Sequence, residues 1–237
     1  MLRSMTPEQV KQVIEFHRDL NFFQAVELAK REGRLIVPND IHDRILTETK
    51  DVKYLRQNYP VWTGTLVIYE KPDRPFGEQA VFSWQHNEVN YSISFEVPEQ
   101  FRGKRNCALV IEHPDFELID FGDNRYELKA IDESNIHLVQ NFAKQNGWHL
   151  TDHGIPVGVE VASSKDPEER SSLGDRDRRS RDARYFWRRL DGSYIGLWCR
   201  DLVGYDRGRG VGAGARSSDV LGVHTVPLTA KPSNFDL

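Results

Sequence analysis

The sequence has little of what several classes of protein require. Two cysteines in 237 residues exclude a disulfide scaffold and a metal site made of cysteine alone. Uninterrupted apolar runs such as residues 108–111 are far shorter than the roughly 20 residues that span a bilayer. Residues 1–10 carry one arginine and no apolar segment. We therefore expect a cytoplasmic chain without a secretory signal or a membrane partner.

No single sign of charge dominates the whole chain, but the charge is unevenly placed. The formal net charge is only −4. From residue 170 onward there are 13 Lys and Arg against 8 Asp and Glu, a net charge of +5, whereas residues 1–169 carry −9. The basic end therefore suits either an external anion or the acidic part of the same chain.

The N-terminal part of the chain, residues 1–58, is predicted to be a helical region. Thr6 opens a capping box, and apolar residues at helical spacing continue from it to His17. A second helix is predicted over residues 22–32, and Asn39 is a suitable N-cap for a third.

From residue 61 the hydrophobic period changes from about 3.6 to about 2, which is typical of β-strands. Strands are predicted over residues 61–70, 79–84, 90–97, 107–112, 116–120 and 125–131. Short strands joined by turn residues indicate a predominantly antiparallel sheet over residues 59–162. One helix, over residues 132–146, is expected to pack against it.

Residues 163–184 are predicted to form a flexible charged loop. They contain seven Lys and Arg, six Asp and Glu, five serines and one large apolar residue, so they bury too little surface to offset their ordering entropy. The C-terminal β segment, residues 185–237, is expected to complete the same domain. Its Asp191-Gly192 pair predicts a hairpin between two apolar and aromatic runs. The fold class is therefore α+β.

One local motif has a recognisable pattern. His113-Pro114-Asp115 is followed twelve residues later by Glu127-Leu128-Lys129. This pattern resembles the motif of PD-(D/E)xK nucleases over residues 114–151. The resemblance implies that Asp115 and Glu127 bind Mg²⁺ or Mn²⁺ and that Lys129 is catalytic. The same residues also fit an exposed hairpin whose charges face water.

Two histidines, His149 and His153, flank Asp152. On a strand both imidazoles share one face and could hold a metal ion with the carboxylate, but surface histidines at strand ends give the same pattern. The helical spacing of a zincin motif is absent, so the pattern assigns no enzyme class.

The C-terminal segment combines arginine, glycine and aromatic residues. Glycines at alternate positions of residues 208–214 predict a turn whose amides bind an anion, or a flexible hairpin loop. The candidate anion-binding residues are Arg207, Arg209 and Arg216. A second basic and aromatic surface consists of Arg184, Tyr185, Trp187 and Arg188.

The leading hypothesis from these features is a binding or interaction protein that needs no cofactor. Its target is an anionic ligand, nucleic acid included, or a protein partner. The alternative is a divalent-metal-dependent nuclease centred on Asp115, Glu127 and Lys129.

We expect trypsin to cut the native chain first within residues 163–184. Basic residues are dense there, and the composition lacks a face that could form a core. Mass spectrometry of the earliest fragments checks this expectation. First cuts at other lysines or arginines, with this segment intact, would contradict it.

Overall fold

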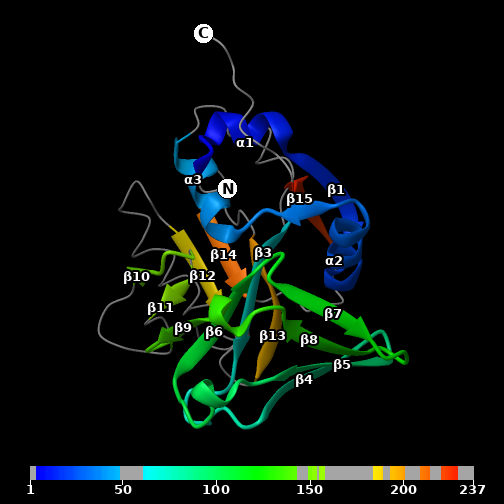
Figure 1. Cartoon of the computed structure of the whole chain (residues 1–237), viewed down its shortest axis with the longest axis vertical. Coiled ribbons are helices and arrows are strands. Elements are labelled where there is room, and N and C mark those ends of the chain that lie inside the picture. Colours follow the sequence, from blue (N-terminus) through cyan, green and yellow to red (C-terminus); the bar gives the residue numbers. More distant parts are fainter. Residues whose placement is uncertain are drawn as a thin grey trace.

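The computed structural model describes residues 4–48, 61–142, 149–153, 155–157, 184–188, 193–200, 209–213 and 220–228 (Figure 1). The predicted flexible loop lies outside the described residues except for Arg184. Three helices and two mixed sheets confirm the α+β class. No helix in the described ranges is long and apolar enough to cross a membrane.

Within the described ranges, the α-helices lie in the first 48 residues. They are α1 (Pro7–Val13), α2 (Phe22–Arg31) and α3 (Asn39–Glu48). The strands of the larger sheet are β1 (Glu15–Leu20), β2 (Arg34–Ile36), β3 (Val61–Tyr69), β6 (Cys107–Glu112), β9 (His137–Gln140), β12 (Arg184–Arg188), β13 (Tyr194–Arg200), β14 (Arg209–Ala213) and β15 (Leu221–Pro227). The smaller sheets contain β4 (Gln79–His86), β5 (Val89–Glu96), β7 (Phe116–Asp120), β8 (Arg125–Ala130), β10 (His149–Leu150) and β11 (Pro156–Val157).

Strand β3 is the centre of the nine-stranded sheet, and all nine of its residues are buried. Antiparallel β13 pairs along one of its edges. On the other edge, parallel β15 pairs with its first two residues and antiparallel β6 with its last five. The sheet continues beyond β13 through β14 to β12, and beyond β6 to β9.

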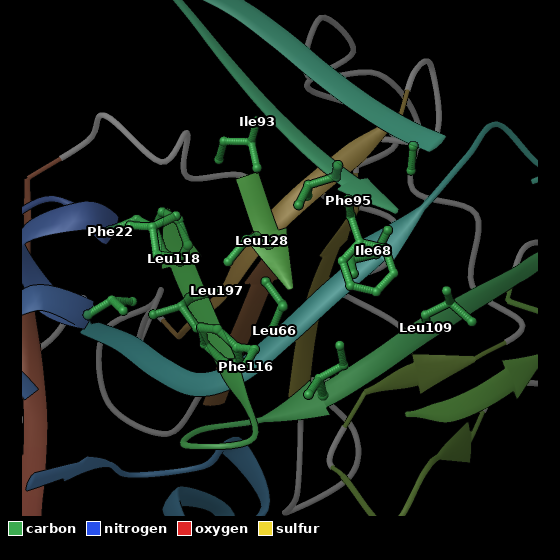
Figure 2. Packing of buried hydrophobic residues seen from close by; sticks show 14 of the residues in the cluster. Phe22, Leu66, Ile68, Ile93, Phe95, Leu109, Phe116, Leu118, Leu128 and Leu197 are labelled. Carbon is green, nitrogen blue, oxygen red and sulfur yellow. The ribbon is translucent and has the colours of Figure 1, made fainter. Parts of the chain in front are cut away.

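The main core lies between the nine-stranded sheet and the four-stranded sheet, whose order is β4-β5-β8-β7. Leu66, Ile68 and Leu197 come from the larger sheet, and Phe95 and Leu128 from the smaller one (Figure 2). These five side chains are at most 1% exposed. Burial of such side chains is the main favourable contribution to folding.

Helix α1 begins where its predicted cap places it, since Thr6 and Gln9 form a capping box. Asn21 and Gln24 form a second capping box, at α2. Helix α3 begins at Asn39 itself, the residue expected to precede it as the N-cap. Residues of α1 and α3 pack around the end of β15 in a separate cluster with Met5, Val37 and Val226. The helices predicted over residues 22–32 and after Pro38 are therefore confirmed as α2 and α3.

The helical pattern that runs on to His17 is interrupted after Val13, where α1 ends. The next residues form β1, which pairs antiparallel with β15 and places Phe16 opposite His224. The predicted continuation of the helical face to His17 is therefore wrong after Val13, because residues of this segment find a strand partner some 200 residues later in the chain.

The helix predicted over residues 132–146 is also wrong in its described part. Glu133–Asn135 form one 3₁₀ turn, and β9 follows and pairs antiparallel with β6. Ile136 and Val139 are three residues apart, which is the spacing of one helix face, but in the structure they pack in two different clusters. The open edge of β6 decides the outcome, because it supplies backbone partners that a helix would leave unused.

The hairpin predicted around Asp191-Gly192 does not form between the strands on its two sides. β14 lies between β12 and β13, pairing parallel with the first and antiparallel with the second. The turn residues themselves lie outside the described ranges. A local turn signal carries no information about a third strand that inserts from later in the chain.

Gly64 lies on β3 at the point where its partner changes from β15 to β6. Its N–H donates to the carbonyl of Val37 at 2.8 Å, and its carbonyl accepts from the N–H of His113 at 2.7 Å. A Cβ atom here would lie 2.1 Å from the carbonyl oxygen of Ile36. The backbone approach between β2 and β3 therefore requires glycine.

Gly64→Ala is expected to lower the free energy of unfolding by about 3 kcal/mol, because backbone atoms on both strands must shift. The matched control is Gly77→Ala, whose Cβ would have its nearest neighbour at 3.9 Å. Urea unfolding of the two variants checks the difference. Equal free energies of unfolding in the two variants would show that the close backbone approach does not require glycine at position 64.

Candidate functional site

The basic and aromatic residues of the C-terminal segment lie on two neighbouring strands. β12 and β14 run parallel, with Arg184 opposite Arg209, Tyr185 opposite Gly210 and Arg188 opposite Ala213. We call these two strands the basic strand pair. It brings together, in the backbone register, the two segments that the sequence analysis treated as separate sites.

The glycine-rich turn predicted over residues 208–214 is wrong for its described part, because residues 209–213 form strand β14. Glycine at alternate positions is compatible with extended backbone, and β12 and β13 supply pairing partners on both sides. Of the three predicted anion-binding arginines, Arg209 starts this strand. Arg207 and Arg216 lie outside the described residues.

The hairpin that carries the nuclease-like motif forms as the sequence predicts. β7 and β8 pair antiparallel, and Phe116, Leu118 and Leu128 are buried on their shared face. Glu127 and Lys129 lie on the opposite face, where Nζ of the lysine is 3.6 Å from Oε1 of the glutamate. Such a partly exposed pair contributes little to stability.

The register separates the two carboxylates that the nuclease motif would place on one cation. The carbonyl of Asp115 accepts from the N–H of Ile131, whereas Glu127 is opposite Ile119. Asp115 is therefore opposite Ile131, which is four residues after Glu127 in the chain. At the rise of a strand, four residues span about 13 Å. Among the described residues, no group of three or more His, Cys, Asp or Glu is placed to hold a metal ion.

Asp115 belongs instead to a corner formed at the end of β6. Burial, and next the nearby carboxylate of Glu112, raise the pKa of Asp115, while a hydrogen bond with Asn135 and the neighbouring His137 act in the opposite direction. A carboxylate beside a second carboxylate in a half-buried setting is the usual origin of such a shift.

Residue His153, which the sequence placed with Asp152 and His149, also reaches this corner. Its Nδ1 is 2.9 Å from Oε1 of Glu112, and its ring centroid is 4.4 Å from that of His137. The side chains of Glu112 and His153 are both largely buried. The sequence gave no sign of this pairing, because the two residues are 41 positions apart.

The cysteines lie in the core. Cys107 and Cys199 are free and buried, and burial raises the pKa of the Cys107 thiol to about 11. A thiol held in its neutral form is a poor nucleophile, which agrees with the expectation of packed thiols.

Comparisons of the chain with protein-family models, curated proteins and solved structures gave no significant match. The functional argument therefore rests on the chain's own residues and their register.

Asp115→Asn is expected to raise the thermal midpoint at pH 7 slightly, on the order of 1–2 °C. A carboxyl with a raised pKa holds its proton more tightly in the folded chain, so its ionisation at neutral pH disfavours folding. The gain should shrink as the pH falls toward 4, where the parent carboxyl is protonated.

The control for this substitution is Glu117→Gln, an exposed carboxylate on β7. It should leave the difference between pH 7 and pH 4 as in the parent. Calorimetry at both pH values measures the effect. A loss of stability at pH 7 in Asp115→Asn would show that its negative charge is needed in the fold.

Proposed function

We propose that the protein binds a polyanionic chain, such as single-stranded nucleic acid or an acidic protein segment, through the basic strand pair. The observation that carries this proposal is the parallel register of β12 and β14, which sets Arg184 beside Arg209. Two arginines on neighbouring strands are separated by about 5 Å, close enough for both to contact successive groups of one anionic chain.

The place of the pair in the sheet adds support. β12 ends the strand order of the nine-stranded sheet, so the pair is at the margin of the sheet as far as the described residues extend. Glycines opposite Tyr185 and Trp187 add no side-chain bulk to β14. Aromatic and arginine residues close together along the chain are also found in proteins that bind single-stranded nucleic acid without sequence preference.

The distribution of charge agrees with this proposal. The net charge of +5 from residue 170 onward favours an anionic partner, although the overall charge of −4 does not. Long-range attraction to a polyanion depends on the local field around the binding surface rather than on the total charge. The nuclease alternative has less support, because the hairpin register keeps Asp115 and Glu127 apart.

Replacing Arg184 and Arg209 together by alanine is expected to weaken binding to a fluorescent single-stranded oligonucleotide at least tenfold. Each charge-assisted contact contributes roughly 1.5–3 kcal/mol. The slope of log K against log salt should also fall by about 1.4, since each lost phosphate contact on a single strand accounts for about 0.7. Fluorescence anisotropy at several salt concentrations measures both quantities.

The matched control removes two arginines outside the pair, Arg31 and Arg125, whose side chains are 69% and 65% exposed. It lowers the net charge equally but leaves the basic strand pair intact, so binding should stay near that of the parent. Equal weakening in both variants would reduce the effect to net charge and contradict the proposed site. A Mg²⁺ or Mn²⁺ arm of the same assay reports any cleavage of the oligonucleotide.

A further inference from the structure

Strand β4 is an edge of the four-stranded sheet, whose order is β4-β5-β8-β7. Figure 1 shows it toward the lower margin of the view, below β5. Among the described residues its strand partner is β5, and the pairing covers all eight residues of β4 without a bulge. An edge strand presents backbone N–H and C=O groups that can pair with a further strand. The edge of β4 is therefore a candidate interaction surface.

Hydrogen-bonded and non-hydrogen-bonded pairs alternate along the β4–β5 ladder, as in every antiparallel pair. A two-residue turn joins His86 to Val89, which makes these two residues a hydrogen-bonded pair. At the other end of the ladder, the N–H of Val97 donates to the carbonyl of Glu78 at 2.8 Å. Even-numbered residues of β4 therefore bond to β5, and odd-numbered residues direct their N–H and C=O groups to the edge.

Val81 and Ser83 are the odd-numbered residues in the middle of the strand. Ser92, which is opposite Ser83, donates its N–H to the carbonyl of Asn124 at 3.0 Å and so agrees with this assignment. Val81 is 46% exposed, and Ser83 is exposed as well. The backbone groups of these two residues are therefore placed to bind a strand that approaches the edge.

Strand β4 lacks the features by which edge strands usually avoid pairing. Its eight residues include no lysine, arginine, aspartate, glutamate, proline or glycine. The opposite edge, β7, has five residues and carries the carboxylates of Glu117 and Asp120. Like charges on paired strands are destabilising, so these carboxylates oppose the pairing of β7 with itself. Of the two edges, β4 is the one suited to pairing.

We propose that two copies of the chain pair through β4, antiparallel about a two-fold axis at Phe82, so that their four-stranded sheets form one continuous sheet. An axis perpendicular to the sheet keeps each face on its own side, so directly opposite residues are both odd-numbered or both even-numbered. Val81 of one copy is then opposite Ser83 of the other. Each such pair exchanges two N–H···O=C hydrogen bonds.

The residues at the ends of β4 favour a second copy and this register. With the axis at Phe82, Glu78 is opposite His86 of the other copy, which carries no negative charge. With the axis at Ser83, Glu78 would be opposite Glu88, and two like-charged pairs would repel. Both glutamates are exposed. An uncharged strand with a glutamate before it and a histidine at its end is thus complementary to an antiparallel copy of itself.

Sedimentation equilibrium of the intact chain, without nucleic acid, tests the dimer. Pairing of one strand buries little surface, so an equilibrium between monomer and dimer is expected at roughly 10 to 200 µM. A parent that is monomeric throughout this range would overturn the proposal. Oligomers larger than a dimer would also overturn it, because a two-fold interface closes after two copies.

Two substitutions act on the edge in different ways. Val81→Lys introduces a charge there, and Ser83→Pro removes an outward N–H without removing a bond to β5. Each should raise the dissociation constant of the dimer by about tenfold or more. The matched control is Val89→Lys, because Val89 is 38% exposed in the same hairpin but belongs to β5, an inner strand. The control should dimerise as the parent does.

Equal weakening by Val81→Lys and Val89→Lys would overturn the proposed interface, as would a dimer that Val81→Lys leaves unchanged. Circular dichroism shows whether Ser83→Pro is folded. If it is not, Val81→Lys and its control still decide.

Disulfide formation tests the register. An equimolar mixture of Val81→Cys and Ser83→Cys should cross-link under mild oxidation faster than either variant alone, because Cα atoms of a hydrogen-bonded pair are about 5.5 Å apart. The native Cys107 and Cys199 are buried. Faster cross-linking in either variant alone would contradict an axis at Phe82. These measurements involve no anion, so their outcome is separate from that of the binding proposed for the basic strand pair.

Discussion

The architecture depends on one strand that has two different partners along the same edge. β3 is buried throughout its length, and its edge opposite β13 passes from β15 to β6 at Gly64. At this point the backbone carbonyl of Ile36 approaches so closely that no side chain fits. The missing side chain lets β2 and the residue after it close over β3, and the N–H of Gly64 is satisfied by Val37 rather than by a strand partner. A buried backbone group left unpaired here would be costly.

The change of strand partner at Gly64 explains why strands from both ends of the chain belong to one sheet. Because β6 pairs with only the later residues of β3, the earlier ones are available to β15, which in turn pairs with both β1 and β2. The N-terminal helices then pack where these strands meet: Val10 and Ile41 share a cluster with Val226 of β15. The C-terminal strand β15 therefore pairs with strands of the N-terminal region as well as with β3.

The parts that could be predicted are those whose signals are local. The capping box at Thr6 placed α1, and short strand-forming runs between turn residues placed β6 and β7 at their observed bounds. The parts that could not be predicted depend on a distant partner. The sequence of residues 132–146 predicts a helix instead of β9, because Ile136 and Val139 have helical spacing and only the edge of β6 supplies a strand partner. In the same way, His153 has Asp152 as its neighbour in sequence, but Glu112 as its partner in space.

The basic strand pair and the corner formed by Glu112 and His153 are on opposite sides of β3 in the strand order. The basic strand pair lies beyond β13, and the corner with Glu112 and His153 is at β6 and β9. In the strand order β12-β14-β13-β3-β6-β9, three steps separate β14 from β6 and five separate β12 from β9. At about 4.8 Å for each step the separation is about 14 to 24 Å. This is roughly two to three times the screening length of about 8 Å at physiological ionic strength. The carboxylates of the corner would therefore exert little repulsion on an anion at β12 and β14, the site proposed above. A chain with a net charge of −4 can in this way keep these carboxylates apart from the strands that carry Arg184 and Arg209, because other strands of the sheet lie between them.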